Sequence, residues 1–426
     1  MKRFAILGIL CVACQDPQPG VDDTGEGTTD TGADESTGDP AAEVTYTATI
    51  RPIIANKCAA CHQDGGAAPF ALSDYEGTSM WAVALADSVA ERRMPPYYAD
   101  NSGDCNSFQD SLWLTDDEIE AFAAWAEAGM PQGDPTIAAP DPRPLPTLDG
   151  ETVTLAMGAE YLPDQSEADD YQCFLVDSPG AVSVTGWDVR PGNDRIVHHV
   201  IGYQVVSASA AQQARDLSAG ADGFDCSGTG PPVDAIALFG WAPGTGAVNF
   251  PEGLGFTIDG ELPLILEVHY NIAGGPGEVD RTEAVLEIDP NGTEREVTGF
   301  DLYDTTFVAP PGTASFTTSA RVSVDDALLG SRMRLLGASP HMHTLGVSQR
   351  VDIIRSDGTR ECLFEMPRWD FNWQQFYWFA NDIHIAPGDE LELTCEFDTT
   401  SRTDAVTWGE GTLDEMCLNG FVGVLE

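Results

Sequence analysis

The feature that most constrains this chain is one short motif, Cys58-Ala59-Ala60-Cys61-His62. Two thiols one helical turn apart can add to the two vinyl groups of a haem, and the histidine that follows can reach the iron as an axial ligand. A redox-active cysteine pair or half of a zinc site has the same Cys-x-x-Cys spacing, but neither needs the adjacent histidine. The motif therefore predicts a covalently attached haem c, held by Cys58, Cys61 and His62.

The segment around the motif, residues 43–135, resembles a class I monohaem cytochrome c, which implies a small all-α domain. Helices are expected over Thr47–Lys57 and Ala82–Arg92. A further helix is expected after Thr115, whose side chain can cap it, and Gly129 should end it.

The expected sixth iron ligand is Met94, in the sequence Arg-Met-Pro-Pro-Tyr. The two prolines impose a rigid extended loop, and cytochrome c relatives use such a loop to present a thioether to iron. Met80 and Met130 are competing candidates, and core packing is the alternative role of Met94. His/Met ligation raises the reduction potential and favours electron transfer over chemistry at the haem.

The N-terminus predicts export. A basic start is followed by the apolar run Phe4–Ala13, which is too short to cross a bilayer but fits a signal peptide. The run ends at Val-Ala-Cys14, which resembles a bacterial lipobox, although Cys11 stands where leucine is usual. Residues 1–14 are therefore expected to be a lipoprotein signal with Cys14 as the acylated residue, and an ordinary signal peptide is the alternative.

Residues 15–42 are acidic, contain no Lys or Arg, and have almost no apolar side chains. Such a segment cannot bury enough surface to fold, so it is expected to be a disordered tether. The whole chain has 69 Asp+Glu against 20 Lys+Arg. This balance excludes nucleic acid as a partner, because phosphate binding needs clustered cations. The expected location is the bacterial cell envelope, in the periplasm or on the outer surface, with the lipid anchor as the only membrane contact.

The rest of the chain favours β-structure. Residues 136–148 form a proline-rich linker, and the 43 Gly and 28 Pro of the chain indicate frequent turns. Strands are expected at Leu264–Tyr270, Arg332–Ala338, Val347–Ile354 and Glu390–Phe397.

Histidine is scarce and clustered. Outside the haem motif there are six, and five of them fall in three short motifs: His198-His199, His269 and His341-Met-His343. In a strand, His341 and His343 point to one face and can chelate one metal. The adjacent His198 and His199 need a strand end, a bulge or different ring nitrogens to do so, with His269 as the available third ligand.

Met416, in Asp-Glu-Met-Cys, is a candidate soft ligand. Imidazoles with a thioether suit copper, especially Cu(I), better than zinc. Each motif taken alone is equally compatible with ordinary packing, but the combination favours copper. His384 matches no ligand position and is expected to be structural.

The order of these motifs resembles that of the copper type II, ascorbate-dependent monooxygenases, which include peptidylglycine α-hydroxylating and dopamine β-monooxygenases. The shared order is His-His, Val-His-Tyr, His-x-His-x-x-Gly and Glu-Met-Cys. The resemblance implies two all-β jelly-roll or β-sandwich domains that face each other across a solvent-filled cleft, residues 149–297 and 298–426, with one copper on each.

The resemblance also implies roles for individual residues. It assigns an electron-donating copper to His198, His199 and His269, and the copper at which O₂ and substrate react to His341, His343 and Met416. It implies the disulfides Cys173–Cys226 and Cys395–Cys417. Cys105 and Cys362 remain without an implied partner, and a bond between them, linking the haem domain to the second copper domain, is an open possibility.

Three positions depart from the peptide-hydroxylating relatives. Ser339, Leu418 and Gly420 stand where those enzymes hold the Arg, Asn and Tyr that grip a peptide carboxylate. Peptide amidation is therefore disfavoured, and a different small substrate is expected.

Together these features predict an exported copper monooxygenase with two coppers and one haem c per chain. It would hydroxylate a C–H bond of an unidentified small substrate with O₂, with electrons from a redox partner or an ascorbate-like reductant arriving through the haem. One alternative is a non-catalytic electron-transfer lipoprotein with a β-sandwich docking module, which has no need for Met416. Another is a copper-storage or delivery protein, which would need Met- or His-rich flexible runs.

Overall fold

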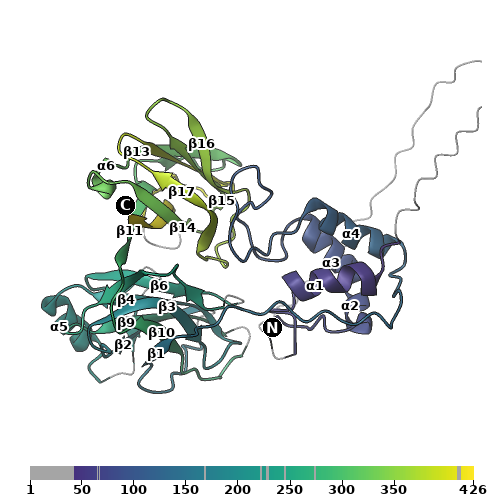
Figure 1. Ribbon diagram of the computed structural model, residues 1–426, viewed down its shortest axis with the longest axis horizontal. Helices are drawn as coiled ribbons and strands as arrows, with labels where there is room; N and C mark the ends of the chain where they lie inside the picture. The colour runs from purple at the N-terminus through teal and green to yellow at the C-terminus, as the bar shows by residue number, and fades with distance from the viewer. Residues whose placement is uncertain are drawn as a thin grey trace, which may run out of the picture. The chain divides into compact units, whose positions relative to one another are not determined.

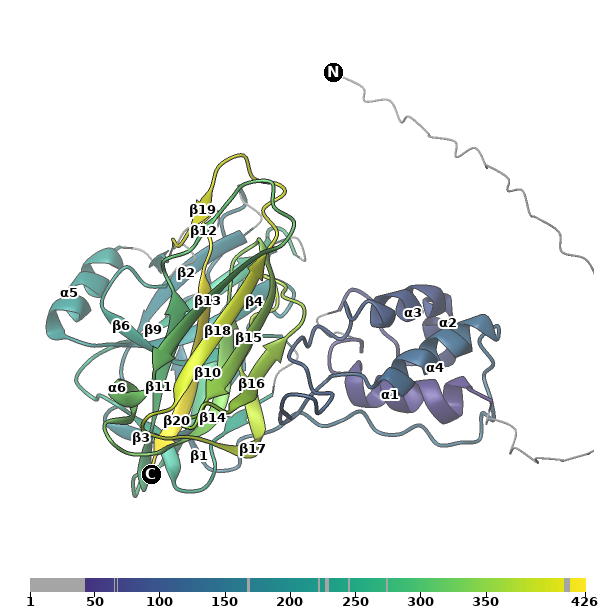
Figure 2. The ribbon, with the colours of Figure 1, turned by 90° about the horizontal axis from the view of Figure 1, so that it is seen from above.

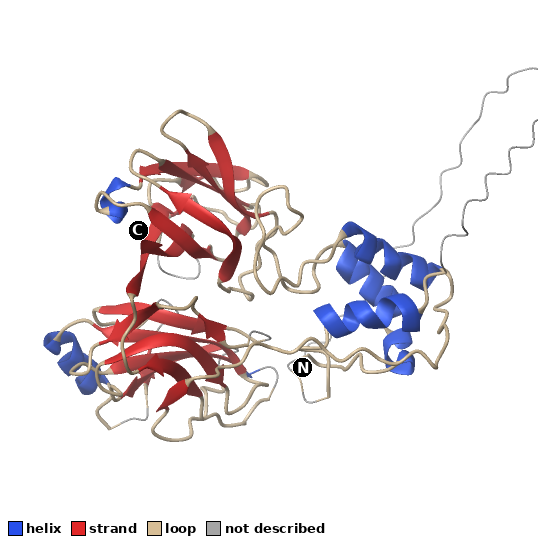
Figure 3. Ribbon diagram, in the orientation of Figure 1, coloured by secondary structure: helices blue, strands red, loops and turns tan. Residues whose placement is uncertain are grey.

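The computed structural model describes residues 43–426 except 65, 67, 167–168, 221–222, 227–229, 244–245, 273–274 and 410–413. The expected signal peptide, Cys14 and the tether lie outside the described residues. Residues 44–426 make up one compact unit, in which strands dominate and most helices precede residue 128 (Figure 3). No helix of the described part is long and apolar enough to cross a membrane.

The first part of the unit is helical (Figure 1). Its elements are the short π-helix η1 (Tyr46–Ile50) and the α-helices α1 (Arg51–Lys57), α2 (Tyr75–Met80), α3 (Ala82–Ala90) and α4 (Asp116–Glu127). The predicted cap of the last helix is confirmed: Thr115 accepts from the Glu118 backbone N–H at 3.2 Å, and the Glu118 carboxylate accepts from the Thr115 N–H at 2.9 Å. Buried Ile50, Phe122 and Trp125 form a core between the helices.

The middle of the chain forms a sandwich of two sheets. Its strands are β1 (Glu151–Ala156), β2 (Asp169–Val176), β3 (Val182–Arg190), β4 (Val197–Val205), β5 (Phe224–Asp225), β6 (Ala235–Trp241), β7 (Val248–Asn249), β8 (Leu254–Ile258), β9 (Leu264–Asn271) and β10 (Glu283–Asp289), with α5 (Ala208–Leu217) after β4. The sheet β5-β2-β9-β4-β6 packs on β1-β10-β3-β8. Phe174 and Leu266 of the first sheet meet Trp187 and Leu286 of the second in one buried cluster.

The C-terminal part forms a second sandwich. Its elements are β11 (Arg295–Asp304), β12 (Val308–Ala309), β13 (Phe316–Ser323), α6 (Asp325–Leu328), β14 (Met333–His341), β15 (Gly346–Ile354), β16 (Arg360–Met366), β17 (Tyr377–Ile385), β18 (Glu390–Phe397), β19 (Val406–Thr407) and β20 (Cys417–Leu425). One layer is β13-β18-β15-β16, visible side by side in Figure 2, and the other is β11-β20-β14-β17. The four predicted strands are confirmed as β9, β14, β15 and β18.

The strand β11 joins the two sandwiches. It pairs in parallel with β8 through Arg295–Leu254 and Glu296–Gly255, and antiparallel with β20 along its length. One nine-stranded sheet therefore contains strands of both sandwiches, a continuity that the sequence did not predict. The boundary placed at residue 298 falls inside this strand.

Three disulfides link six of the eight described cysteines: Cys105–Cys362, Cys173–Cys226 and Cys395–Cys417. The last two are the pairs implied by the family resemblance. The first resolves the open pairing and attaches the segment before α4 to β16. Cys58 and Cys61 are free thiols.

Candidate metal centres

The first candidate centre consists of His198 and His199 at the start of β4 and His269 in β9. The pairing of the two strands shifts between Val197 and His199, so that His198 is the extra residue of a bulge. This is one of the irregularities that the sequence required for adjacent histidines to share a metal. The ring centroids of His198 and His199 each lie 4.7 Å from that of His269.

Hydrogen bonds fix the tautomer of His269. Its Nε2 donates to the Asp169 carboxylate at 2.9 Å, which leaves the Nδ1 lone pair facing inward. That Nδ1 lies 3.2 Å from Nδ1 of His199, and Nδ1 of His198 is buried without a hydrogen-bond partner. One ligand atom from each of the three histidines lies within 4.8 Å of the others. This convergence of buried ring nitrogens fits a metal ion.

The charge state of the first centre suits a metal. Burial lowers the pKa of His199 well below its usual value, and the neighbouring His269 and His198 add to this shift. Burial, helped by His198, lowers the pKa of His269 to about 3, and the pKa of His198 is lowered by burial as well. Neutral imidazole is the form that binds metals, so the site is ready for a cation at neutral pH.

The second candidate centre contains His341 at the end of β14 and His343 in the following turn, with ring centroids 5.1 Å apart. Nδ1 of His341 donates to Oε1 of Gln374 at 2.7 Å, and Nδ1 of His343 donates to the Asp414 carbonyl at 3.2 Å. The His341 ring therefore keeps Nε2 for a ligand. Burial and His343 lower the pKa of His341 to about 4, so this ring is also neutral.

Glu415 fixes Met416 beside the second centre. The Glu415 carboxylate is fully buried and accepts from the backbone N–H groups of His343 (2.8 Å), Leu345 (2.6 Å) and Met416 (3.2 Å). Burial raises the pKa of Glu415 to about 7, while these backbone donors lower it. The Cys395–Cys417 disulfide holds the other side of Met416. The His-x-His turn and the methionine thus belong to one hydrogen-bonded assembly.

The haem motif folds as the start of a helical turn after α1. The His62 N–H donates to the Cys58 carbonyl at 3.0 Å, and Nδ1 of His62 donates to the Phe70 carbonyl at 3.0 Å, which leaves Nε2 free. Burial raises the pKa of the Cys58 thiol to about 12, and Cys61 is also protonated because burial raises its pKa. Two free thiols and an imidazole with an available Nε2 fit covalent haem attachment.

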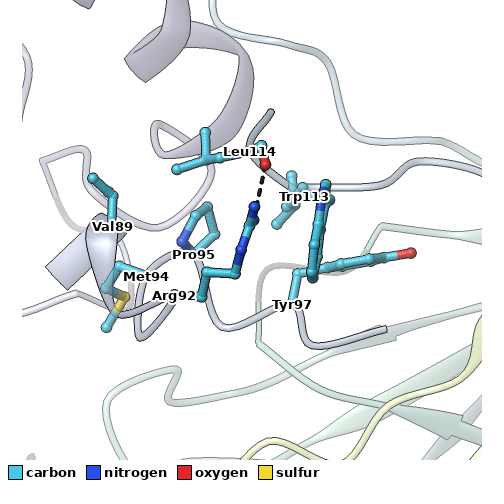
Figure 4. A pocket seen from close by; sticks show the side chains of 8 residues that line it. Val89, Arg92, Met94, Pro95, Tyr97, Trp113 and Leu114 are labelled. Carbon is cyan, nitrogen blue, oxygen red and sulfur yellow. Dashed lines mark hydrogen bonds between the residues drawn. The ribbon is translucent and has the colours of Figure 1, made fainter. Parts of the chain in front are cut away.

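Met94 lies at the edge of a small cavity between α3 and the segment before α4 (Figure 4). The cavity, of about 10 Å³, has room for one water and is not a haem cleft. In Figure 4 the Met94 sulfur points away from Trp113. Its side chain is partly exposed, whereas Met80 is 79% exposed and Met130 packs on the helical core.

The segment between β16 and β17 contacts both centres, and the sequence did not single it out. Gln374 binds His341, Trp369 Nε1 donates to the His343 carbonyl at 2.9 Å, and the Trp373 ring centroid lies 6.3 Å from that of His198. The only sequence signal is a concentration of aromatic residues between Trp369 and Trp378. Asp169 and Glu415 were missed in the same way, because no spacing rule points to them.

The three departures from the peptide-hydroxylating pattern lie close to the second centre. Gly420 pairs with Ser339, and Leu418 pairs with His341. Asp301 pairs with Gly420 from the other side, and a Cβ on Gly420 would lie 3.1 Å from its carboxylate. An acidic group therefore stands beside these positions. His384, expected to be structural, lies in β17 and contacts Glu426 at 3.2 Å.

Comparison with known proteins links the second sandwich to a family. Residues 298–422 match the model of the copper type II ascorbate-dependent monooxygenase C-terminal domain. The chain is 28% identical over 240 residues to the human putative DBH-like monooxygenase protein 2, covering 53% of this chain and 46% of the relative. It is 23% identical over 243 residues to dog dopamine beta-hydroxylase, covering 54% and 38%.

A further match covers more of the chain. The chain is 25% identical over 321 residues to the peptidyl-glycine alpha-amidating monooxygenase A of Xenopus laevis, covering 73% of this chain and 32% of the relative. The chain therefore spans less than half the length of these relatives. Among solved structures, the major capsid protein P2 of bacteriophage PM2 gives a TM-score of 0.27 at 8% identity, covering 65% of this chain and 98% of that one, which is too low to support a fold assignment.

Proposed function

We propose that this chain is an exported copper-dependent monooxygenase that hydroxylates a C–H bond of a small substrate: RH + O₂ + 2e⁻ + 2H⁺ → ROH + H₂O. The observation that carries the proposal is the orientation of the five histidines. A hydrogen bond to Asp169 leaves Nδ1 of His269 facing into the first centre, and hydrogen bonds to Gln374 and to the Asp414 carbonyl fix Nδ1 of His341 and of His343 in the second. The similarity of residues 298–422 to a copper monooxygenase domain supports it.

Each centre would hold one copper. In the first centre the ligands would be His198, His199 and His269, and in the second His341, His343 and Met416. Copper supplies the one-electron chemistry with O₂ that side chains lack. The protein residues orient the ligands: Asp169 and Gln374 set the ring tautomers, and Glu415 holds the turn of the second centre against the backbone of Met416.

The helical part would supply electrons. Cys58 and Cys61 would form the thioether links to a haem c, with His62 and Met94 as axial ligands. Such a haem passes one electron at a time and is closed to O₂. The hydrogen bond from His62 to the Phe70 carbonyl orients the ring for this role. The external donor would be a redox partner or an ascorbate-like reductant.

Export fits the three disulfides of the described residues, because such bonds persist in oxidising compartments. We place the protein in the bacterial cell envelope, attached through a lipid on Cys14. Mass spectrometry of the mature N-terminus tests this: a diacylated cysteine is expected, and an unmodified N-terminus would leave a secreted or periplasmic protein.

The function is tested with a protein of residues 43–426, matured with haem and titrated with copper. One haem and two tightly bound coppers per chain are expected, followed by substrate-dependent O₂ consumption in a screen of small molecules. One haem with no tight copper would contradict the monooxygenase and favour an electron-transfer protein with a β-sandwich docking module. A His343→Ala variant should lose one copper and all O₂ consumption.

A further inference from the structure

An arm of the helical part covers two sheet edges of the second sandwich. β16 and β17 are the last strands of its two layers. The arm, residues 97–109, contacts both strands. The Asp100 N–H donates to the Glu365 carbonyl of β16 at 2.8 Å, and the Gln109 N–H donates to the Trp378 carbonyl of β17 at 2.7 Å. Because the arm lies between α3 and α4 in the chain, it attaches the helical part to this sandwich.

The Cys105–Cys362 disulfide adds a covalent bond between the arm and β16, and it is more accessible than the other two disulfides. The four cysteines of those two are at most 1% exposed. Cys105 and Cys362 are half-buried and line a cavity of about 500 Å³. The cavity opens to solvent, since the side chain of Asp382 in its lining is 81% exposed. A small molecule can therefore reach the sulfur atoms of this disulfide and not those of the other two.

One cation in the lining of this cavity has no acidic partner. The two lining carboxylates are paired, Glu361 with Arg355 and Asp382 with Arg334 at 3.7 Å. The Arg332 guanidinium also lines the cavity and forms no ion pair or hydrogen bond with any residue that the structure describes. In a chain with 69 Asp+Glu against 20 Lys+Arg, acidic partners are abundant. The unpaired cation therefore favours a ligand that brings its own carboxylate.

We propose that this cavity binds a small carboxylate-bearing thiol, which reduces the Cys105–Cys362 disulfide and loosens the arm. The ligand's carboxylate pairs with Arg332. Its thiolate attacks one sulfur and forms a mixed disulfide, and the other sulfur leaves as a thiolate and takes up a proton. A second thiol molecule then resolves the mixed disulfide.

The sum of the two steps is protein disulfide + 2 RSH → protein dithiol + RSSR. Two electrons pass from the ligand thiols to the protein sulfur atoms, and the two thiol protons end on Cys105 and Cys362. No step involves a metal, so the inference stands apart from the proposed function.

The surroundings of the disulfide accommodate the reduced form. Oε2 of Glu365 lies 4.0 Å from Sγ of Cys362 and can accept the thiol proton once the disulfide is open. Arg350 lies 2.5 Å from the same carboxylate and balances its charge. A half-buried thiol at Cys362 therefore has a hydrogen-bond acceptor already in place.

Reduction removes the covalent attachment from the middle of the arm. The two ends remain packed, because Tyr97 and Phe108 are buried in the core of the sandwich. Between them, residues 102–104 are exposed, and segments with few buried contacts open most easily. The attachment of the helical part to the second sandwich therefore responds to the thiol content of the surrounding compartment.

The first test follows each disulfide separately in the full protein, under anaerobic conditions and without denaturant. Reduced glutathione, which carries carboxylates, is the probe, and uncharged 2-mercaptoethanol is the comparison. Samples are quenched with acid, alkylated and mapped by mass spectrometry, which distinguishes Cys58 and Cys61 because they are not disulfide-bonded. Cys105–Cys362 should open at least about tenfold faster than the other two, since buried disulfides react only after local opening. Equal rates for all three, or no reduction, would overturn the proposal.

The second test examines the ligand's carboxylate. Arg332→Gln should slow reduction by glutathione about two- to fivefold, the scale of one exposed charge pair, and leave reduction by 2-mercaptoethanol unchanged. Arg332→Lys keeps the charge and should react faster than the glutamine variant. Arg215→Gln, at an exposed position on α5 of the other sandwich, is the matched control and should react as wild type. If Arg332→Gln slowed both thiols equally, or neither, the cavity would not select a carboxylate.

Hydrogen exchange measures the release of the arm. After glutathione treatment the backbone amides of residues 100–106 should exchange faster, while those of β18 stay protected. In a protein with both Cys105→Ser and Cys362→Ser, the same amides should exchange rapidly with or without thiol. Unchanged exchange in the reduced wild-type protein would contradict the release.

Discussion

The Nδ1 atoms of His199 and His269 lie 3.2 Å apart, and the far side of the His269 ring is held by Asp169. Because His269 carries its proton on Nε2, its Nδ1 can only accept. The two Nδ1 atoms are therefore bridged either by the proton of His199 or by a cation. A metal ion bound between these two atoms would take the place of the proton that otherwise bridges the two rings.

The first prediction concerns Asp169, which fixes the tautomer of His269. Asp169→Asn removes the negative charge behind the ring and should weaken copper binding at the first centre by about tenfold or more, as for other outer-sphere carboxylates. Copper titration followed by EPR measures this. Asp188→Asn, in the other sheet of the same sandwich, is the control and should bind copper normally. If the Asp169→Asn and Asp188→Asn variants bound copper equally tightly, Asp169 would have no role in the first centre.

The second prediction concerns Glu415. Glu415→Gln replaces one acceptor oxygen by an amide that faces backbone N–H groups, so it should destabilise the protein by about 1–3 kcal/mol. It should also weaken Cu(I) binding at the second centre, because His343 and Met416 share this carboxylate. Denaturant unfolding and Cu(I) competition measure the two effects. Glu390→Gln, which breaks a surface pair with Arg321, should change neither.

The third prediction concerns Met94. Met94→Ala should keep the covalent haem, lose the absorption of thioether-ligated iron and lower the reduction potential. Copper reduction should slow, while chemically pre-reduced protein keeps its O₂ uptake. Met80→Ala, at an exposed position, should behave as wild type. Equal loss of activity in both assays would count against a relay through the haem.

The fourth prediction concerns the Cys105–Cys362 disulfide, whose cysteines are 257 residues apart in the sequence. Replacing both by serine should lower the free energy of unfolding by about 2–4 kcal/mol. The segment between Tyr97 and Gln109 should then become sensitive to proteases, because it loses its covalent attachment to β16. Mass spectrometry of a limited digest tests this, and an unchanged cleavage pattern would mean that packing alone holds the segment.

The fifth prediction concerns substrate charge. Ser339, Leu418 and Gly420 offer no cation beside the second centre, and the Asp301 carboxylate borders Gly420. Small molecules that bear a carboxylate near the oxidised carbon should therefore be poor substrates compared with neutral or cationic analogues of equal size. Peptides ending in glycine should support no O₂ consumption above background, and rapid turnover of such peptides would contradict this reading.

The sequence predicted the elements that local rules govern. The Thr115 cap, the four strands and the need for an irregularity at His198-His199 all follow from side-chain chemistry or strand periodicity. The bulge at His198 shows how such reasoning succeeds: two adjacent side chains cannot reach the same face of a regular strand, so the backbone must deviate.

The residues that orient the histidines could not be predicted in the same way. Asp169 is 100 residues from His269 in the sequence, and Gln374 is 33 residues from His341. Their roles arise from strand pairing and from the path of the segment before β17. A single Asp or Gln in such a segment has no periodic pattern to mark it. The Cys105–Cys362 bond could not be predicted either, because the number and spacing of cysteines do not show which of them lie close together in the fold.

The pairing of β11 with strands of both sandwiches has a practical consequence for truncated proteins that contain only one sandwich. A fragment that starts at Thr298 would lose Arg295 and Glu296, the residues that pair with β8, and also Val297, which forms the first pair with β20. The excised first sandwich would then expose the edge of β8, a surface prone to aggregation. The two sandwiches, when expressed separately, should aggregate or reassociate with each other. Both sandwiches should therefore be expressed together as one polypeptide.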